Sequence, residues 1–510
     1  MLSRKTGLIA LLSAFMIGGA PAAESETKDS LALASAWEIT SVDPAISGFA
    51  LQRLQVQENL VDADSEGTLR PGLATEWSAS EDGLTWRFTL RENVSFHDGT
   101  PFDAAAAVSA LQRAAEQPGI LENAPLGEIT ADGDAVVITL EKPFAALPSL
   151  LAHATTIIPA PASFDADGNP VEAIGTGPFM VGELKLPLGI DLVRFDDYWG
   201  EIPKLAKVNY LAAGRAESRA LLAESGEADI VFGFDPAGFT RLQSVESVET
   251  RAVPIPRAVM LKVNAGHPFF EAAEARQALS LAIDREGIAT GITRFPEAAA
   301  TQLFPPALGG WHDKSLEPLA YDPEKAKELL AGLGWTASDD GILEKDGERF
   351  AIQLRTFPDR PELPLMATAL QDQWRAIGVE LDVSVASYAE IPAGHQDGSL
   401  EVALYARNYG LTPDPIGTIL NDFGTGGGDW GAMNWDAPDV AEALETIAES
   451  ADEAIRKPLI TEATAAIHDG LAIIPITWYM HTVSIAKGLD GVIVDPRQRT
   501  YGLERISWAE

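Results

Sequence analysis

The amino-acid sequence predicts an α/β protein with mixed sheets. Segments with the two-residue period of a strand alternate with segments of helical character along the whole chain of 510 residues. This interleaving is typical of sheets covered by helices. No short-period repeat or low-complexity linker breaks the pattern, and a chain of this length is expected to hold about three domain-sized units.

The first strands and helices are indicated by alternation and by capping residues. Thr85–Leu90 alternates polar and apolar residues, which predicts a half-buried strand. A turn at Asp98-Gly99 leads to Asp103, the expected N-cap of an alanine-rich helix over residues 104–115. Ala135–Leu140 is rich in β-branched residues and predicts another strand.

Similar signals continue in the second half of the chain. Asp322-Pro323 opens a predicted helix over residues 324–330, closed by Gly332 or Gly334. A longer helix is predicted over residues 363–377 and a strand over residues 379–385, with Gly378 between them.

The N-terminus has the three parts of a secretory signal. Arg4 and Lys5 precede an apolar run over residues 7–19, and Ala20-Pro21-Ala22 supplies the small residues of a cleavage site. The run is shorter than the ~20 residues that a membrane-spanning helix needs. We therefore expect residues 1–22 to be removed and the rest of the chain to leave the cytoplasm.

Cysteine content and charge further narrow the cellular location and the possible binding partners. The chain has no cysteine, so it cannot carry a lipid anchor on an N-terminal cysteine, and we expect an outer membrane to retain it in a periplasm. Its formal net charge of −38 disfavours binding to nucleic acid or anionic lipid. The charge is dispersed, so we interpret it as a solubility feature rather than as a preference for cationic ligands.

Searches for catalytic and metal motifs find none. The sequence lacks His-Glu-x-x-His, Gly-x-Ser-x-Gly and a phosphate-binding loop ending in Lys-Ser/Thr. Residues 165–169 resemble the start of a calcium loop but lack its closing glutamate, so we expect a polar turn. The seven histidines show no metal-ligand spacing. We expect no catalytic residue, no protein-built metal site and no cofactor.

A series of short motifs occurs in a characteristic order. They are Asp43-Pro44-Ala45 and residues 69–77, 82–91, 94–102, 175–179, 198–200, 276–279, 282–285, 321–326 and 334–335. Together they resemble the peptide- and nickel-type solute-binding proteins of ABC importers, the large family 5 receptors.

The resemblance implies a two-lobed clamp of the type II periplasmic-binding-protein class with an extra subdomain. Lobe I would comprise residues 23–257 and 476–510, with the subdomain inserted at about 48–165, and lobe II residues 258–475. A small solute would be held between the lobes and delivered to the permease subunits of an ABC importer, the receptor acting as a monomer.

The stretch that ends at Asp414 resembles the family's ligand-facing strand and loop in lobe II. Tyr405 and Tyr409 offer stacking faces with polar tips. Arg407 offers a fork for a carboxylate, and Asn408 can both donate and accept hydrogen bonds. Asp414 is included as a ligand contact, with a purely structural role in the turn as the alternative.

Two further contacts are predicted on lobe I. Phe49 follows the opening motif in an expected cleft-facing loop, with core packing as the alternative. His153 follows a mostly apolar run near the place where family members carry a ligand loop, and an ordinary semi-buried role is its alternative.

Two departures from the family pattern leave the ligand open. Leu411 stands where peptide receptors usually have an acidic residue, and residues 421–430 lack the histidine of nickel receptors. The remaining ligands are an atypical peptide, an opine or a metal chelate, with a nickel or metallophore receptor as the alternative. A secreted hydrolase and a periplasmic chaperone are the alternatives of another class. Residues 424–428 are expected to form a mobile lip or a plain surface loop.

Overall fold

The computed structural model describes residues 28–358 and 360–509. The predicted signal segment, residues 1–22, lies outside the described residues. In the part of the chain that is described, no helix is long and apolar enough to cross a membrane.

A ten-stranded mixed sheet runs through the molecule. In spatial order its strands are β17 (Glu380–Val385), β16 (Ala351–Thr356), β18 (Val402–Asn408), β12 (Val248–Val263), β19 (Ile473–Ala486), β11 (Ile230–Phe232), β1 (Ser30–Ser35), β10 (Lys207–Ala212), β9 (Gly189–Arg194) and β8 (Phe179–Lys185). Parallel and antiparallel pairs both occur, so the predicted α/β class with mixed sheets is confirmed.

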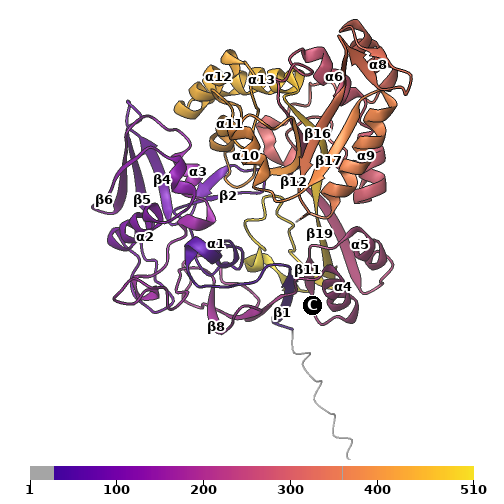
Figure 1. Ribbon diagram of the computed structural model, residues 1–510. Helices are drawn as coiled ribbons and strands as arrows, with labels where there is room; N and C mark the ends of the chain where they lie inside the picture. The colour runs from indigo at the N-terminus through magenta and orange to yellow at the C-terminus, as the bar shows by residue number, and fades with distance from the viewer. Residues whose placement is uncertain (1–27, 359, 510) are drawn as a thin grey trace, which may run out of the picture.

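The chain forms three parts around this sheet (Figure 1). The base holds β1 and β8–β11 with helices α1 (Pro44–Arg53), α4 (Ala216–Ser225) and α5 (Pro236–Leu242). The side part is a separate antiparallel sheet, β4 (Ala74–Ala79), β5 (Thr85–Leu90), β7 (Ala135–Leu140) and β6 (Leu126–Asp132), packed on α2 (Ala104–Glu116), and it also contains α3 (Leu147–Leu150).

The upper part holds β16–β18 and most of the remaining helices (Figure 1). Its helices are α6 (Ala273–Leu281), α7 (Arg285–Ile288), α8 (Pro323–Gly332), α9 (Glu362–Ala376), α10 (Glu390–Gln396), α11 (Ile416–Phe423), α12 (Pro438–Glu449) and α13 (Glu453–Gly470). Short strands complete the structure: β2 (Val61–Ala63), β3 (Leu69–Pro71), β13 (Thr336–Ala337), β14 (Leu343–Lys345), β15 (Glu348–Arg349), β20 (Leu489–Asp490) and β21 (Ser507–Trp508).

Several local predictions agree closely with these bounds. The strands predicted at residues 85–90 and 135–140 are β5 and β7, and Asp103 caps α2 by accepting a hydrogen bond from Ala106 N. Asp322 caps α8 in the same way, and Gly378 follows α9 with a φ of 89°. These elements could be predicted because caps and alternation are local properties of the chain.

Two long strands, β12 and β19, connect the base to the upper part. They pair with each other over most of their lengths, but the register shifts between Pro254 and Ala258. Proline has no N–H to give to a ladder, so Pro254 and Pro256 favour this irregularity. On one side of it β19 pairs with β11 of the base, and on the other side β12 pairs with β18 of the upper part. The chain therefore passes between the parts within one continuous sheet.

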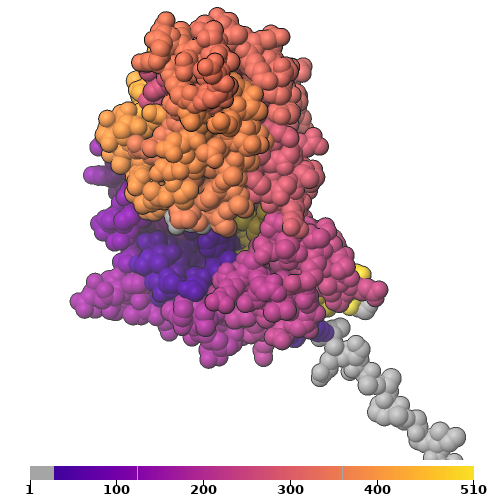
Figure 2. All heavy atoms as spheres, turned by 45° about the vertical axis from the view of Figure 1, so that its right-hand side comes forward, coloured from indigo at the N-terminus to yellow at the C-terminus, as the bar shows by residue number. Residues whose placement is uncertain are grey.

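The side part and the upper part contact each other directly. Asp414 N donates to Ser149 Oγ over 2.7 Å, and Ala145 N donates to Ala448 O over 2.8 Å. One apolar core contains buried residues of both parts, and Phe88 is one of those from the side part. Figure 2 shows the upper part above the indigo-to-magenta base, with a hollow between them in which yellow C-terminal residues are visible. The structure is thus a clamp whose parts touch.

Candidate ligand-binding site

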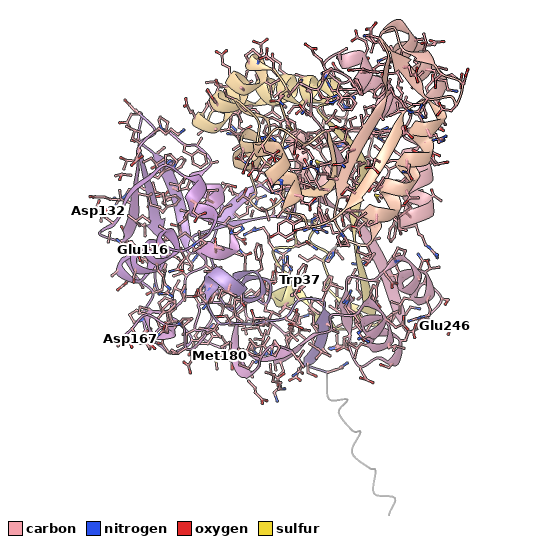
Figure 3. The ribbon with its side chains drawn as sticks, viewed as in Figure 1. Trp37, Glu116, Asp132, Asp167, Met180 and Glu246 are labelled. Atoms are coloured by element: carbon pink, nitrogen blue, oxygen red, sulfur yellow. The ribbon has the colours of Figure 1, made fainter. Side chains whose placement is uncertain are left out.

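A cavity of about 320 Å³ lies where base, side part and upper part meet. We call it the arginine-lined cavity. Its lining includes Trp37, Phe49, Arg53, His153, Tyr210, Arg257, Asn408, Gly410, Leu411, Arg497, Gln498, Arg499 and Tyr501. Figure 3 places Trp37 in the middle of the molecule, between the base and the upper part. Three of the residues predicted from the sequence, Phe49, His153 and Asn408, converge here.

Helix α1 supplies an aromatic and a cationic side chain to the cavity. Asp43 caps the helix by accepting a hydrogen bond from Ala45 N over 3.0 Å. Phe49 therefore lies on a helix, and the predicted loop position is wrong. Phe49 and Arg53 are four residues apart and share one helix face. Phe49 is 41% exposed, so its ring is accessible to a ligand.

His153 is held next to Phe49 by the packing of α1. A Cβ on Gly48 would lie 2.2 Å from Ala154 O, so only glycine allows this approach. The rings of Phe49 and His153 are edge to face, with centroids 5.2 Å apart. His153 Nδ1 accepts from Thr155 N over 3.1 Å. Burial, together with the charge of Arg499, lowers the pKa of His153 to about 4, so a neutral imidazole lies at the cavity wall.

Strand β18 and Tyr409, which directly follows it, carry the four predicted residues on two faces. Side chains alternate along a strand, so Tyr405, Arg407 and Tyr409 point one way and Asn408 the other. Tyr405 and Tyr409 are at most 1% exposed, and the Tyr405 hydroxyl donates to Trp430 O. Asn408 lines the arginine-lined cavity, whereas the other three do not. The structure therefore brings only Asn408 of this strand to the site.

Arg407 is occupied by a buried carboxylate. Its Nε and Nη2 donate to the two oxygens of Asp422 over 2.8 and 2.6 Å, and Asp422 has no exposed surface. Burial acts to lower the pKa of Arg407, but the charge of Asp422 outweighs it and raises that pKa. The guanidinium that the sequence suggests for a ligand is thus neutralised within the protein.

Asp414 also has a partner within the protein. Its carboxylate forms an ion pair with Arg456 and accepts from Ile416 N over 3.0 Å at the start of α11. Asp414 does not line the cavity. We conclude that it sets the turn, which is the structural alternative considered for it.

The glycine-rich segment at residues 424–428 does not line the cavity either. Gly428 O and Asp429 O accept hydrogen bonds from the buried Lys262 Nζ over 2.8 and 3.0 Å. A Cβ on Gly427 would lie 1.9 Å from Ala432 O. The segment is therefore packed at Gly427 and Gly428 and exposed at Thr425 and Gly426. Among the described residues, no group of three or more His, Cys, Asp or Glu side chains could hold a metal ion.

Sequence reasoning missed most of the cationic and aromatic lining. Trp37 follows β1, Arg257 lies at the register shift of β12, and Arg497 and Arg499 come from the C-terminal segment. These residues are far apart in the sequence and none belongs to a local motif. The one usable signal is Pro254-Ile255-Pro256, which interrupts a strand beside Arg257 and indicates a crossover.

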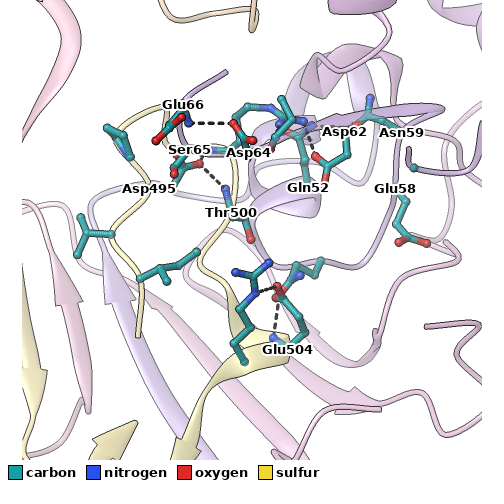
Figure 4. A pocket seen from close by; sticks show the side chains of 18 of the residues that line it. Gln52, Glu58, Asn59, Asp62, Asp64, Ser65, Glu66, Asp495, Thr500 and Glu504 are labelled. Atoms are coloured by element: carbon teal, nitrogen blue, oxygen red, sulfur yellow. Dashed lines mark hydrogen bonds and ion pairs between the residues drawn. The ribbon is translucent and has the colours of Figure 1, made fainter. Parts of the chain in front are cut away.

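A larger cavity of about 850 Å³ adjoins the first, and Gln52 and Arg499 line both. We call it the acidic cavity. Figure 4 shows its carboxylates: Glu58, Asp62, Asp64, Glu66, Asp495 and Glu504. Much of this charge is compensated by hydrogen bonds and ion pairs within the protein. The Asp495 carboxylate accepts from the main-chain N–H groups of Arg497, Arg499 and Thr500, and Asp64 pairs with Arg70.

Glu58 is the carboxylate of the acidic cavity with the most strongly raised pKa. Its carboxylate accepts hydrogen bonds from Thr176 Oγ1, Tyr198 OH and Trp199 Nε1 over 2.8–2.9 Å. Burial nevertheless raises its pKa to about 7. Glu58 thus joins the chain beside α1 to the motif residues Thr176, Tyr198 and Trp199 of the base.

We expect Glu58→Gln to change how stability depends on pH. The pKa of Glu58 in the folded state is raised to about 7, so protonation of Glu58 stabilises the fold. This contribution is fully present below the pKa of Glu58 in the unfolded chain and is lost as pH rises through 7. Between pH 5 and 8 the wild type should therefore lose about 1–3 kcal/mol relative to the variant. Urea unfolding of both proteins at the two pH values measures this difference. Glu66→Gln, an exposed carboxylate of the same cavity, is the control, and equal pH dependence in wild type and Glu58→Gln would contradict the assignment.

A clamp of mixed α/β parts with a cavity at their junction is typical of solute-binding proteins. The model of the bacterial extracellular solute-binding proteins, family 5 (middle), matches residues 68–430. The chain belongs to this family, and its predicted fold, a two-lobed clamp, is confirmed.

Characterised relatives cover much of the chain. A nickel-binding periplasmic protein of Escherichia coli K12 is 28% identical over 453 residues, which are 85% of each chain. The glutathione-binding protein GsiB of the same strain is 29% identical over 65% of this chain and 66% of its own. NikA from Brucella suis in complex with Fe(III)-EDTA has a TM-score of 0.83 at 25% identity, covering 94% of this chain and 99% of its own. A nickel ABC transporter structure from Bacillus halodurans also has a TM-score of 0.83, at 26% identity and with 94% and 100% covered.

Proposed function

We propose that this protein is a periplasmic receptor of an ABC importer that captures a peptide-like or carboxylate-bearing solute in the arginine-lined cavity and delivers it to the permease. We assign residues 23–257 and 476–510 to lobe I, with the subdomain at about 48–165, and residues 258–475 to lobe II. The observation that carries the proposal is a cationic cavity at the junction of these lobes in a chain of net charge −38.

Charge and shape at the cavity support an anionic solute. Four arginines line it against a single carboxylate, that of Glu38. Guanidinium groups match the planar geometry of carboxylates. The exposed rings of Trp37 and Phe49 offer apolar surface for the rest of the solute. A ligand that contacts both lobes would favour the closed clamp by its greater affinity for that state.

We further propose that the protein has no catalytic activity and works as a monomer. Family 5 proteins are transport receptors, which favours binding without turnover. The lining residues supply charge, amide groups and aromatic surface, all of which serve recognition. A hydrolase would require turnover of an ester, peptide or glycoside by the pure protein, which activity assays with chromogenic substrates would detect.

A metal chelate is the second candidate ligand. The Brucella suis relative is described with Fe(III)-EDTA, a polycarboxylate chelate, and the Escherichia coli relative as nickel-binding. A chelate brings its own metal ligands and presents carboxylates to the protein, so an arginine-lined wall suits it without any protein-built metal site.

Native mass spectrometry of protein purified from its own periplasm, with metal analysis, would identify a bound solute. A thermal-shift panel of glutathione, di- to tetrapeptides, opines, Ni(II)–histidine and Fe(III)-EDTA then tests binding. A solute at 100 times its Kd stabilises the folded state by about 2.7 kcal/mol. If no solute of the panel raises the melting temperature and none co-purifies, the receptor proposal fails.

Trp37→Ala is expected to weaken binding with little effect on folding. Its side chain is 55% exposed, so truncation removes ligand contact area but little core packing. For any solute of the panel that binds, we expect a loss of about 1–2 kcal/mol, or 5- to 30-fold in Kd, by calorimetry. Tyr321→Ala, a similarly exposed aromatic residue outside the cavity lining, should leave Kd unchanged. The assignment of Trp37 fails if both variants bind alike.

A further inference from the structure

The four arginines of the cavity differ in what they already bind. Arg53 Nε donates to Gln498 O. Arg497 donates to the main-chain carbonyls of Thr412 and Glu66, and Arg499 donates to carbonyls and to a carboxylate. These three guanidinium groups therefore hold the walls of the cavity together.

Arg257 is the exception. Among the described residues its guanidinium has no hydrogen-bond acceptor and no carboxylate partner, and it lies over the Tyr479 ring, 5.4 Å from the centroid. Burial, with the nearby charges of Arg360 and Arg53, lowers the pKa of Arg257 to about 10. A guanidinium has five N–H donors, and leaving them without acceptors in a partly dry site costs free energy. The Tyr479 ring and the nearby charge of Glu362 offset part of this cost, but neither accepts a hydrogen bond from the guanidinium.

The sheet register places Asn408 beside Arg257. The two residues are direct partners of the β12–β18 pair, so their side chains share one sheet face. Both line the cavity. Asn408 Oδ1 accepts from Gly410 N over 2.9 Å, which leaves its amide N–H groups as the donors on this face. The wall thus presents donors that need an acceptor.

Arginines from three segments of the chain lie near this position. Arg53 ends α1 in the base, Arg257 lies at the crossover, and Arg360 precedes α9 in the upper part. The charges of Arg53 and Arg360 disfavour a charged Arg257, whereas those of Tyr479 and Glu362 favour it. An anion between these arginines would offset repulsion across the junction of the two lobes.

We propose that Arg257 binds an oxyanion of the captured solute, a carboxylate being the matching group, and that Asn408 donates a second hydrogen bond to it. This inference rests on the proposed function and deepens it. It assigns the anionic end of the solute to the crossover between the lobes rather than to Arg407. The negative charge of the solute would offset repulsion among the arginines at the junction of the lobes.

The melting temperature of the unliganded protein is the first test. Arg257→Met keeps an apolar stem but removes the unpartnered charge. The variant is expected to melt about 1–3 °C above the wild type in the absence of solute. Arg251→Met, on the same strand but in an exposed ion pair with Glu249, is the matched control and should not melt above the wild type. If Arg257→Met melts well below the wild type, the guanidinium is satisfied within the protein and the inference is overturned.

Calorimetry with glutathione and Fe(III)-EDTA is the second test. Arg257→Met should weaken the binding of either probe that the wild type binds by at least about tenfold, Arg257→Lys by less, and Arg251→Met not at all. Glutathione diethyl ester, which lacks free carboxylates, should bind wild type and Arg257→Met alike.

The outcomes separate this inference from the proposed function. Equal affinity of wild type and Arg257→Met for a bound probe overturns the role of Arg257 and leaves the receptor proposal intact. Failure of every solute to bind the wild type removes the receptor proposal. The role of Arg257 as an unpaired charge is then still decided by the unliganded melting temperatures.

Discussion

Replacing Arg407 with alanine is expected to destabilise the protein by about 3–5 kcal/mol, because it leaves a buried charge without its partner. The carboxylate of Asp422 is fully buried and receives two hydrogen bonds from Arg407. The sequence alone predicts a different result, weaker binding of a carboxylate-bearing ligand. Urea unfolding compared with calorimetric binding distinguishes the two expectations.

A double variant supplies the control for this prediction. Arg407→Ala with Asp422→Ala removes both charges, so it should be clearly more stable than Arg407→Ala alone. If Arg407→Ala unfolds like the wild type but loses affinity for a bound solute, the structural role assigned to the ion pair is wrong. In that case the ligand contact that the sequence predicts for Arg407 would be correct.

Gly177→Ala is expected to cost about 3 kcal/mol of stability, at the upper end of what overpacking usually costs. A Cβ at this position would lie 2.1 Å from Gln55 O, so the main chain must move to admit it. Gly175 meets Val56 O in the same way. The Gly-Thr-Gly-Pro motif is therefore a close approach of two main-chain segments, as expected from its lack of a phosphate-binding lysine. It also positions Thr176 beside Glu58.

Gly417→Ala is the matched control for Gly177→Ala. A Cβ on Gly417 would meet no atom within 4 Å, and the residue lies inside α11. Alanine should stabilise the helix there by about 0.5–1 kcal/mol. Thermal and urea unfolding of both variants give the comparison. Equal stability of the two variants would show that the close approach at Gly177 carries no cost.

Local signals predicted the elements but not the site. The caps of α2 and α8 and the alternation of β5 and β7 each depend on residues within a few positions of one another. The same alternation could have divided β18 correctly, since Tyr405 and Arg407 cannot share a face with Asn408. Its use would have singled out Asn408, the one of the three that lines the cavity.

Other assignments needed partners that lie far away in the chain. Asp414 could be recognised as a structural residue only from its ion pair with Arg456, and Arg407 only from Asp422. Arg257 could be singled out only by comparing it with the other cavity arginines, each of which donates at least one hydrogen bond within the protein. No pattern within one segment carries that information.

The sequence by itself determined the α/β class, the local elements and, through ordered motifs, the family of the protein. These features follow from backbone propensities and from short-range hydrogen bonds, which are encoded within a few residues. The tertiary structure alone decided which cations are free to meet a solute. Whether a guanidinium is available depends on the acceptors that folding brings to it, and for Arg407 the chain supplies one whereas for Arg257 the described residues supply none.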